Sequence, residues 1–225
     1  FSIYGLPWLI ILGLLSSIVL YIRFRDLSTE QAQSLQQKGN TRQALKGMLV
    51  IMLPILTHIF VTSFLYANIL NFLPTFLTGE GASFQFSGAA FSIIEISGTV
   101  GVFLYSRLSD RIGQRVIILM TTLVMPVFAL LFLQVEGWMQ VPMLIGTGFL
   151  AFSANPAFLS IIQHHFPESR SLANGIYMAA SFVLRSITAI LVGLLADHFG
   201  LRSVFTVSAW GAFLAIPLVF LLPKK

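Results

Sequence analysis

Long apolar runs separated by short polar stretches dominate this chain. A helix rises about 1.5 Å per residue, so about 20 apolar residues are enough to cross the hydrocarbon core of a bilayer. Runs of roughly this length or longer lie at residues 1–22, 48–77, 86–105, 116–133, 141–163, 172–195 and 203–222. The pattern therefore predicts an all-α fold, a polytopic membrane bundle of seven transmembrane helices.

The basic residues predict how this bundle is oriented, because Lys and Arg gather in cytoplasmic loops. Three arginines crowd the turn at residues 106–115, and the polar segment 23–47 holds five bases against two acids. Both are therefore expected on the cytoplasmic side, and segment 23–47 is expected to form a cytoplasmic loop. Arg202 is the one base that this orientation places on the outer side.

The composition supports a membrane protein and excludes several kinds of site. The chain has 225 residues, of which 56% are hydrophobic and only 9% charged, whereas soluble domains carry about 25% charged residues. There is no cysteine, so disulfides, thiolate metal sites and a cysteine nucleophile are excluded. The first run has no starting Met and no charged segment before it, so we expect a membrane span, with coding sequence upstream of Phe1, rather than a signal peptide.

A ten-residue pattern occurs at two junctions between apolar runs. Residues 106–115 and 193–202 both read small-x-Leu-small-Asp-x-x-Gly-x-Arg. A motif that returns at the same kind of junction predicts an internal repeat of three helices.

The first copy of this pattern resembles the signature cytoplasmic turn of the major facilitator superfamily, Gly-x-Leu-(Ala/Ser)-Asp-Arg-x-Gly-Arg-Arg. The matching positions are Leu108, Ser109, Asp110, Arg111, Gly113 and Arg115. Ser106 and Gln114 depart from it: Ser106 puts close helix packing in doubt, and Gln114 removes one charge. Residues 73–76 and 173–175 are similar to bacterial drug-efflux carriers, the fosmidomycin-resistance type among them.

The resemblance implies a division of the chain and a set of partners. Residues 1–22 would be the last helix of an N-terminal half, 23–47 the central cytoplasmic loop, and 48–225 a C-terminal six-helix transport half with a 3+3 inverted repeat. The partners would be a small-molecule substrate, protons as coupling ion, the lipid bilayer and the rest of the N-terminal half. The expected location is the bacterial plasma (inner) membrane, with no cofactor and no metal.

Two charged residues lie inside predicted spans, where a charge must be paired, protonated or wet. Glu95 lies about 16 Å from the inner end of its span, and Arg185 about 12 Å from the outer end of its own. Both are therefore expected near the midplane. Glu95 suits a proton carrier or a structural carboxylate, and Arg185 suits an anionic substrate group or a pair with Glu95.

Other polar residues in the spans are candidate cavity residues. They are Tyr66, Asn68, Asn71, Asn155, Tyr177 and Ser181. Amides beside helix-breaking prolines suit substrate contacts, and hydrogen bonds between helices are the equal alternative. Asn68 and Asn71 are three residues apart and should share a face. His58 could join a proton relay, but a bond between helices is favoured.

The repeated turns supply a candidate gate, formed by Asp110, Arg111, Gly113, Arg115, Asp197 and Arg202. Asp110 could accept backbone N–H bonds and pair with an arginine of the other half, so that breaking the contact lets the halves rock. The alternative is an anchor that only fixes orientation.

The function favoured by these features is secondary transport by alternating access, as proton-coupled efflux of a drug or small organic solute. Uptake by symport is the nearest variant. A seven-helix receptor fits the helix count, but every lysine lies outside the apolar runs, so none could hold retinal. An intramembrane enzyme is disfavoured, since no zinc motif and no Ser/His pairing is evident in the spans.

Overall fold

The computed structural model describes residues 14–19, 21–22 and 41–222, except for the side chains of residues 41–47, Ser106, Ser109 and Asp110. All regular structure in these residues is helical. The chain divides into two units, Phe1–Lys46 and Gly47–Lys225. The predicted first span and the predicted central loop lie largely outside the described residues, so the fold below is that of the second unit.

Six helical stretches of the described residues are long and apolar enough to cross a membrane. They are Met48–Gly79, Phe84–Tyr105, Gln114–Phe132, Gly137–His165, Arg170–Phe199 and Leu201–Leu221. These stretches confirm the second to seventh predicted spans to within a few residues. Large apolar side chains such as Phe103, Val207 and Leu214 are 70–72% exposed, as expected for helices whose outer faces contact lipid tails.

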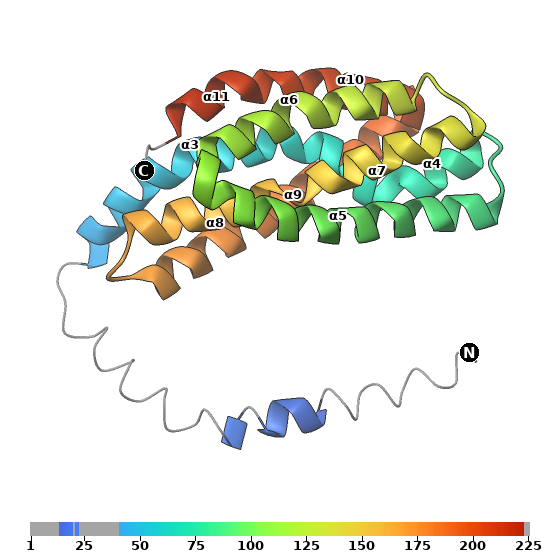
Figure 1. The fold of residues 1–225 in the computed structure, drawn as a ribbon. Helices are drawn as coiled ribbons and strands as arrows, with labels where there is room; N and C mark the ends of the chain where they lie inside the picture. Colours follow the sequence, from blue (N-terminus) through green and yellow to red (C-terminus); the bar gives the residue numbers. More distant parts are fainter. Residues whose placement is uncertain (1–13, 20, 23–40, 223–225) are drawn as a thin grey trace. The chain divides into compact units, whose positions relative to one another are not determined.

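The helices lie side by side in one elongated bundle (Figure 1). In chain order they are α3 (Thr41–Ala67), the π-helical turn η2 (Asn68–Phe72), α4 (Leu73–Gly79), α5 (Phe84–Ile112), α6 (Gln114–Phe132), η3 (Gly137–Met139), α7 (Gln140–Ala151), α8 (Ala154–His165), α9 (Arg170–Phe199), α10 (Leu201–Ala212), η4 (Phe213–Ala215) and α11 (Ile216–Leu221). The α5–α6 and α8–α9 connections lie at one end of the bundle, and the α4–α5 and α9–α10 connections at the other (Figure 1). This alternation agrees with the predicted inner and outer ends.

Three of the spans are interrupted, each near a proline; the last of them passes from α10 through η4 into α11, where Pro217 lies in the first turn. The first passes from α3 through η2 into α4, where Pro74 lies in the first turn. Proline has no N–H to give to the preceding turn, and a π-turn absorbs the irregularity. Asn68 is fully buried whereas Asn71 is exposed, so the prediction that they share a face was wrong. It assumed α-helical spacing through a segment that is π-helical.

The second interruption separates α7 from α8 at Phe152 and Ser153. Pro156 lies in the first turn of α8, so it cannot donate a backbone bond to the end of α7. The Ser153 hydroxyl donates to the Phe149 carbonyl at 2.6 Å, which satisfies a backbone acceptor at the break.

The composition of the two repeated motifs predicted polar turns between spans. In the structure most of their residues are instead helical. The helix α5 continues through the charged residues to Ile112, and α9 continues to Phe199. A single glycine then reverses the chain: Gly113 has φ +90° and ψ 147°, and Gly200 has φ +79° and ψ 148°. Each motif is therefore helical on both sides of one glycine, because only glycine adopts this backbone conformation without strain.

Glycines also bring α5 and α7 into close contact. A Cβ atom added at Gly101 would collide with the Phe149 carbonyl oxygen, and one at Gly148 with the Ser97 hydroxyl. Small residues allow membrane helices to approach this closely. Helices α5 and α7 are therefore closely packed against each other, and α8 follows α7 along the chain.

Candidate functional site

Arg185 lies midway along α9 and joins three helices. Its Nη2 atom donates to Asn155 Oδ1 on α8 at 2.8 Å. Its guanidinium carbon lies 5.8 Å from the centre of the Tyr66 ring on α3, within the range of a cation–π contact. A hydrogen-bond acceptor and an aromatic face therefore stabilise this charge, but neither neutralises it.

The breaks in the helices place these partners. Asn155 lies in the first turn of α8, directly after the break at Phe152 and Ser153. Tyr66 lies in the last turn of α3, just before the π-turn. Interrupted helices at the centre of a membrane protein typically carry ligand sites, because the break frees polar groups at that depth.

Two cavities share Arg185 and Asn155 in their walls. One, of about 20 Å³, extends between α3, α6 and α8; its lining residues include His58, Thr62, Tyr66, Thr122 and Phe158. The other, of about 380 Å³, extends along α8 and α9; its lining residues include Pro156, Tyr177, Met178, Ser181 and Phe182.

Arg185 is the charged residue of both cavities. No Asp or Glu is among their described lining residues. An arginine cannot readily lose its proton, so it needs a counter-charge or water. The arrangement can therefore accept an anionic group next to Arg185.

The structure does not bring Glu95 to this cluster. Glu95 lies at the middle of the apolar part of α5 and is partly exposed. Among the described residues its carboxylate has no hydrogen bond and no ion pair, and it lines neither cavity. Its backbone carbonyl accepts a bond from the Thr99 hydroxyl at 2.9 Å. Within the described part of the chain, Glu95 and Arg185 are thus separate sites.

The remaining predicted cavity residues divide into two groups. Tyr66, Asn155, Tyr177 and Ser181 line the cavities around Arg185. Asn68 instead donates to Ser208 Oγ on α10 at 2.9 Å and is fully buried. It holds two helices together. Asn71 is exposed and lines neither cavity.

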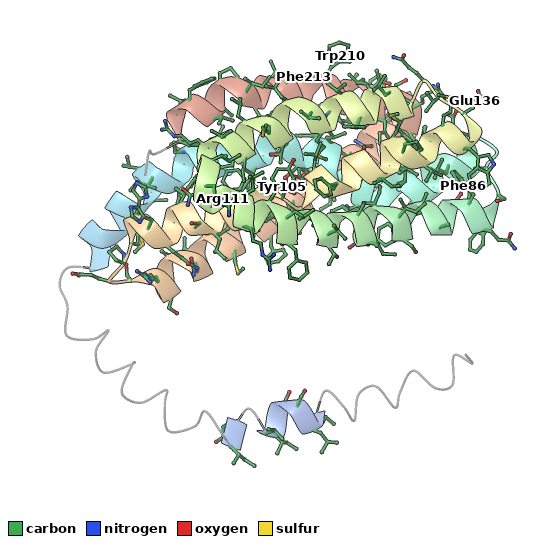
Figure 2. The ribbon with its side chains drawn as sticks, viewed as in Figure 1. Phe86, Tyr105, Arg111, Glu136, Trp210 and Phe213 are labelled. Atoms are coloured by element: carbon green, nitrogen blue, oxygen red, sulfur yellow. The ribbon has the colours of Figure 1, made fainter. Side chains whose placement is uncertain are left out.

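The candidate gate residues lie at the two ends of the bundle. Arg202 donates to a Glu80 carboxylate oxygen and, at 2.7 Å, to the Leu133 carbonyl oxygen. These contacts explain why a base occurs at the predicted outer end. Arg111 lies near the α5–α6 turn, at the end of the bundle opposite to Glu136 (Figure 2).

Fewer contacts are described for the other members of the gate set. Asp197 is exposed, and the side chain of Asp110 lies outside the described residues. The Nε atom of Arg115 is buried and has no hydrogen-bond partner among the described residues.

Two further polar contacts join helices, and their partner residues, Thr122 and Ser160, were not predicted from the sequence. His58 Nε2 lies 2.9 Å from Thr122 Oγ1 on α6, which confirms the favoured bond between helices. Gln114 Nε2 donates to Ser160 Oγ on α8 at 2.7 Å. A signal for the first was present, because Thr121 and Thr122 lie in the middle of a charge-free apolar run.

Comparison with known proteins places the whole chain in one group. The family model described as Major Facilitator Superfamily matches residues 1–187 and 55–225. The Multidrug resistance protein MdtG of Salmonella typhi is 28% identical over 167 residues, which are 72% of this chain and 41% of that relative. MdtG of Salmonella arizonae matches with the same identity and coverage. The chain thus spans about two-fifths of the length of these curated relatives.

Proposed function

Because the chain belongs to the major facilitator superfamily, we propose that it forms the C-terminal half of a secondary transporter. Residues 1–22 would end the N-terminal half, and residues 23–47 would link the halves. Transport would proceed by alternating access, with the halves rocking about a central site. The MdtG relatives are named as multidrug resistance proteins, which favours export of a drug or small organic solute from a bacterial cell across its inner membrane.

The observation that carries this proposal is the position of Arg185. A guanidinium at the centre of a membrane span is costly, and the charged residues that are kept there commonly mark substrate or ion pathways. Here it is held by Asn155 and Tyr66 at the edge of two cavities whose described linings contain no carboxylate. We therefore assign Arg185 as the anchor for an anionic or hydrogen-bond-accepting group of the substrate. Tyr177 and Ser181 would line the path beside it.

Glu95 is proposed as a proton carrier for this transport. It lies at the middle of a membrane span without a partner among the described residues. Ionisable residues within membrane spans commonly mark ion pathways and proton relays. Proton entry at Glu95 would drive the export of substrate at Arg185.

The anchor role of Arg185 is tested with Arg185→Gln in the intact carrier. The probes are fosmidomycin, which is anionic, and ethidium, which is cationic. Cells that lack other efflux pumps are assayed for survival, and membrane vesicles for exchange of labelled probe. We expect Arg185→Gln to reduce fosmidomycin exchange by about tenfold or more, because the variant loses the positive charge that would pair with the anionic group of the probe. Arg170→Gln is the matched control, because Arg170 is exposed at the start of the same helix.

The outcomes separate the anchor from a packing role. Fosmidomycin exchange that survives Arg185→Gln would contradict the substrate site. An equal loss for fosmidomycin and ethidium would also contradict it, because a packing defect does not distinguish charge. For the carrier role, Glu95→Gln should abolish proton-driven transport and leave exchange intact, with Glu136→Gln as control. Undiminished proton-driven transport would reduce Glu95 to a packing role.

A further inference from the structure

His58 is a buried histidine with one bonded and one unbonded ring nitrogen. The residue is 2% exposed. Its Nε2 atom contacts Thr122 Oγ1 at 2.9 Å, and its ring lies against Phe158 with 5.3 Å between ring centres. Its Nδ1 atom has no hydrogen-bond partner among the described residues.

The contacts of Thr122 determine which nitrogen carries the proton. The Thr122 hydroxyl donates its one hydrogen to the Ile118 carbonyl oxygen at 2.6 Å. It can therefore only accept from His58, so Nε2 carries the hydrogen of the neutral ring. Nδ1 is then a bare acceptor inside the membrane. If the bond served only to join α3 to α6, the amide of an Asn or Gln side chain could donate the same N–H to Thr122. The unbonded Nδ1 acceptor of histidine would then not be needed.

The cavity beside His58 has room for one water molecule. Its volume is about 20 Å³, and a single water needs about 10–15 Å³ together with two to four polar partners. The polar lining residues are His58, Thr62, Ser63, Tyr66, Thr121, Thr122, Asn155 and Arg185.

Few other charged or titratable groups face this cavity. Among the described lining residues, the other charged or titratable groups are Tyr66 on α3 and Arg185 on α9. The described lining residues from α6, α8 and α10 include no charged or titratable group. Arg185 is a cation in the same cavity, so it opposes a second positive charge at His58 unless an anionic group lies beside it.

We propose that His58 is a second proton-binding group of this carrier, loaded at Nδ1 through one water held between α3, α6 and α8. A hydronium ion in the cavity gives its proton to the Nδ1 lone pair and remains as water, while the ring becomes an imidazolium. Release to water reverses the step. The inference rests on the proposed transport function, but it concerns a different group from Glu95. His58 shares its cavity with Arg185, whereas Glu95 lies on α5 outside it.

The test compares His58→Gln with Thr122→Val in the intact carrier, reconstituted in vesicles with fosmidomycin as the probe. Glutamine keeps an N–H donor for Thr122 but cannot be protonated, and Thr122→Val keeps the imidazole but removes its partner. We expect His58→Gln to lower uptake driven by a pH gradient by about tenfold, and to lower exchange without a gradient by clearly less than that. Thr122→Val should retain its dependence on the gradient. Gradient-driven uptake that is unchanged in His58→Gln would overturn the proposal.

A spectroscopic measurement covers the case in which His58→Gln does not fold. The other histidines of the carrier, among them His164, His165 and His198, are replaced by Gln, and the remaining labelled ring is followed by ¹⁵N NMR between about pH 8 and about pH 4. We expect the Nε2–H tautomer at high pH and a growing imidazolium signal at low pH. A ring that stays neutral throughout, or the Nδ1–H tautomer, would overturn the inference. Both results are independent of Arg185→Gln, so a failure of the proposed substrate site would be recognised separately.

Discussion

The two glycine turns of the molecule have the same backbone and different surroundings. In both, a long helix ends one residue before a glycine, and the next helix begins one residue after it. Gly113 and Gly200 have φ values of +90° and +79° with ψ values of 147° and 148°. In both, the second residue after the glycine is an arginine, Arg115 or Arg202.

The arginines differ in what they bind. At the turn around Gly200, on the predicted outer side and called the outer turn below, Arg202 is bonded to Glu80 and to the Leu133 carbonyl oxygen, so three segments of the bundle are joined. At the turn around Gly113, on the predicted inner side and called the inner turn below, the Nε atom of Arg115 is buried without a partner among the described residues. Buried N–H groups in native proteins are nearly always bonded. Among the described residues, the outer turn is therefore bonded through its arginine, whereas no partner is described for the Nε atom of Arg115 at the inner turn.

The largest effect is expected at the two glycines themselves. Alanine at Gly113 or Gly200 would have to adopt a conformation that is almost confined to glycine, at a cost of about 1–3 kcal/mol. No atom lies within 4 Å of a Cβ built at either position, so this cost is backbone strain alone. We expect Gly113→Ala and Gly200→Ala to lower the unfolding free energy of the purified carrier equally, as measured by chemical denaturation in detergent.

A matched control comes from helical glycines that also have free space. Gly88 and Gly175 lie within α5 and α9, with nothing within 4 Å of an added Cβ and no positive φ. Alanine there should be neutral or stabilising, because glycine is the poorer helix former. If one turn tolerated alanine while the other did not, their shared backbone geometry would not be the cause.

Replacing the aspartate of each turn should change the transport rate at one turn and not at the other, rather than change the stability of either. Asp110 and Asp197 both precede their glycine by three residues, near a helix C-terminus, where a negative charge is unfavourable. If Asp110 pairs with the other half, Asp110→Asn should slow transport by about tenfold. Asp197→Asn should change it little, since Asp197 is exposed. The measurement is fosmidomycin exchange in vesicles, and equal rates in the two variants would leave the inner turn as an orientation anchor.

The contacts of Arg202 predict a smaller effect, confined to the outer turn. Arg202→Gln removes the ion pair with Glu80 and the bond to Leu133, and should cost about 1–2 kcal/mol of unfolding free energy. The pair is half-exposed, with side-chain exposures of 57% and 41%, so its coupling in a double-mutant cycle with Glu80→Gln should be below about 1 kcal/mol and weaken in salt. Glu136→Gln, an exposed outer carboxylate, is the control. A coupling well above this range would mean that the pair is shielded from water.

The sequence predicted the positions of these turns but not their extent. The repeated Asp-x-x-Gly-x-Arg pattern located both glycines correctly. Its charged residues indicated a polar turn of several residues. The chain is instead helical on both sides of each glycine, because one glycine is sufficient to reverse the chain direction. Polarity records which residues face water, and it does not record where a helix ends.

The polar cluster shows a second limit of sequence-based prediction. Arg185 was predicted near the midplane and Asn155 as a cavity residue, but the bond between them was not predicted. Depth follows from counting residues along a helix, whereas contact depends on how each helix is rotated. The break before α8 sets the rotation of Asn155. For the same reason, equal depth did not bring Glu95 to Arg185.

The smallest effect is expected at Gln114, where the inner turn departs from the family's arginine. Gln114 is 4% exposed and donates to Ser160 on α8 at 2.7 Å, so it joins the start of α6 to a neighbouring helix. A double-mutant cycle of Gln114→Ala and Ser160→Ala should give a coupling of about 1 kcal/mol in unfolding free energy, the usual net value of one hydrogen bond. Gln134→Ala, an exposed glutamine after the other end of α6, should show no coupling to Ser160. A coupling near zero for Gln114 as well would mean that the bond adds nothing, and that the inner turn is held by its glycine alone.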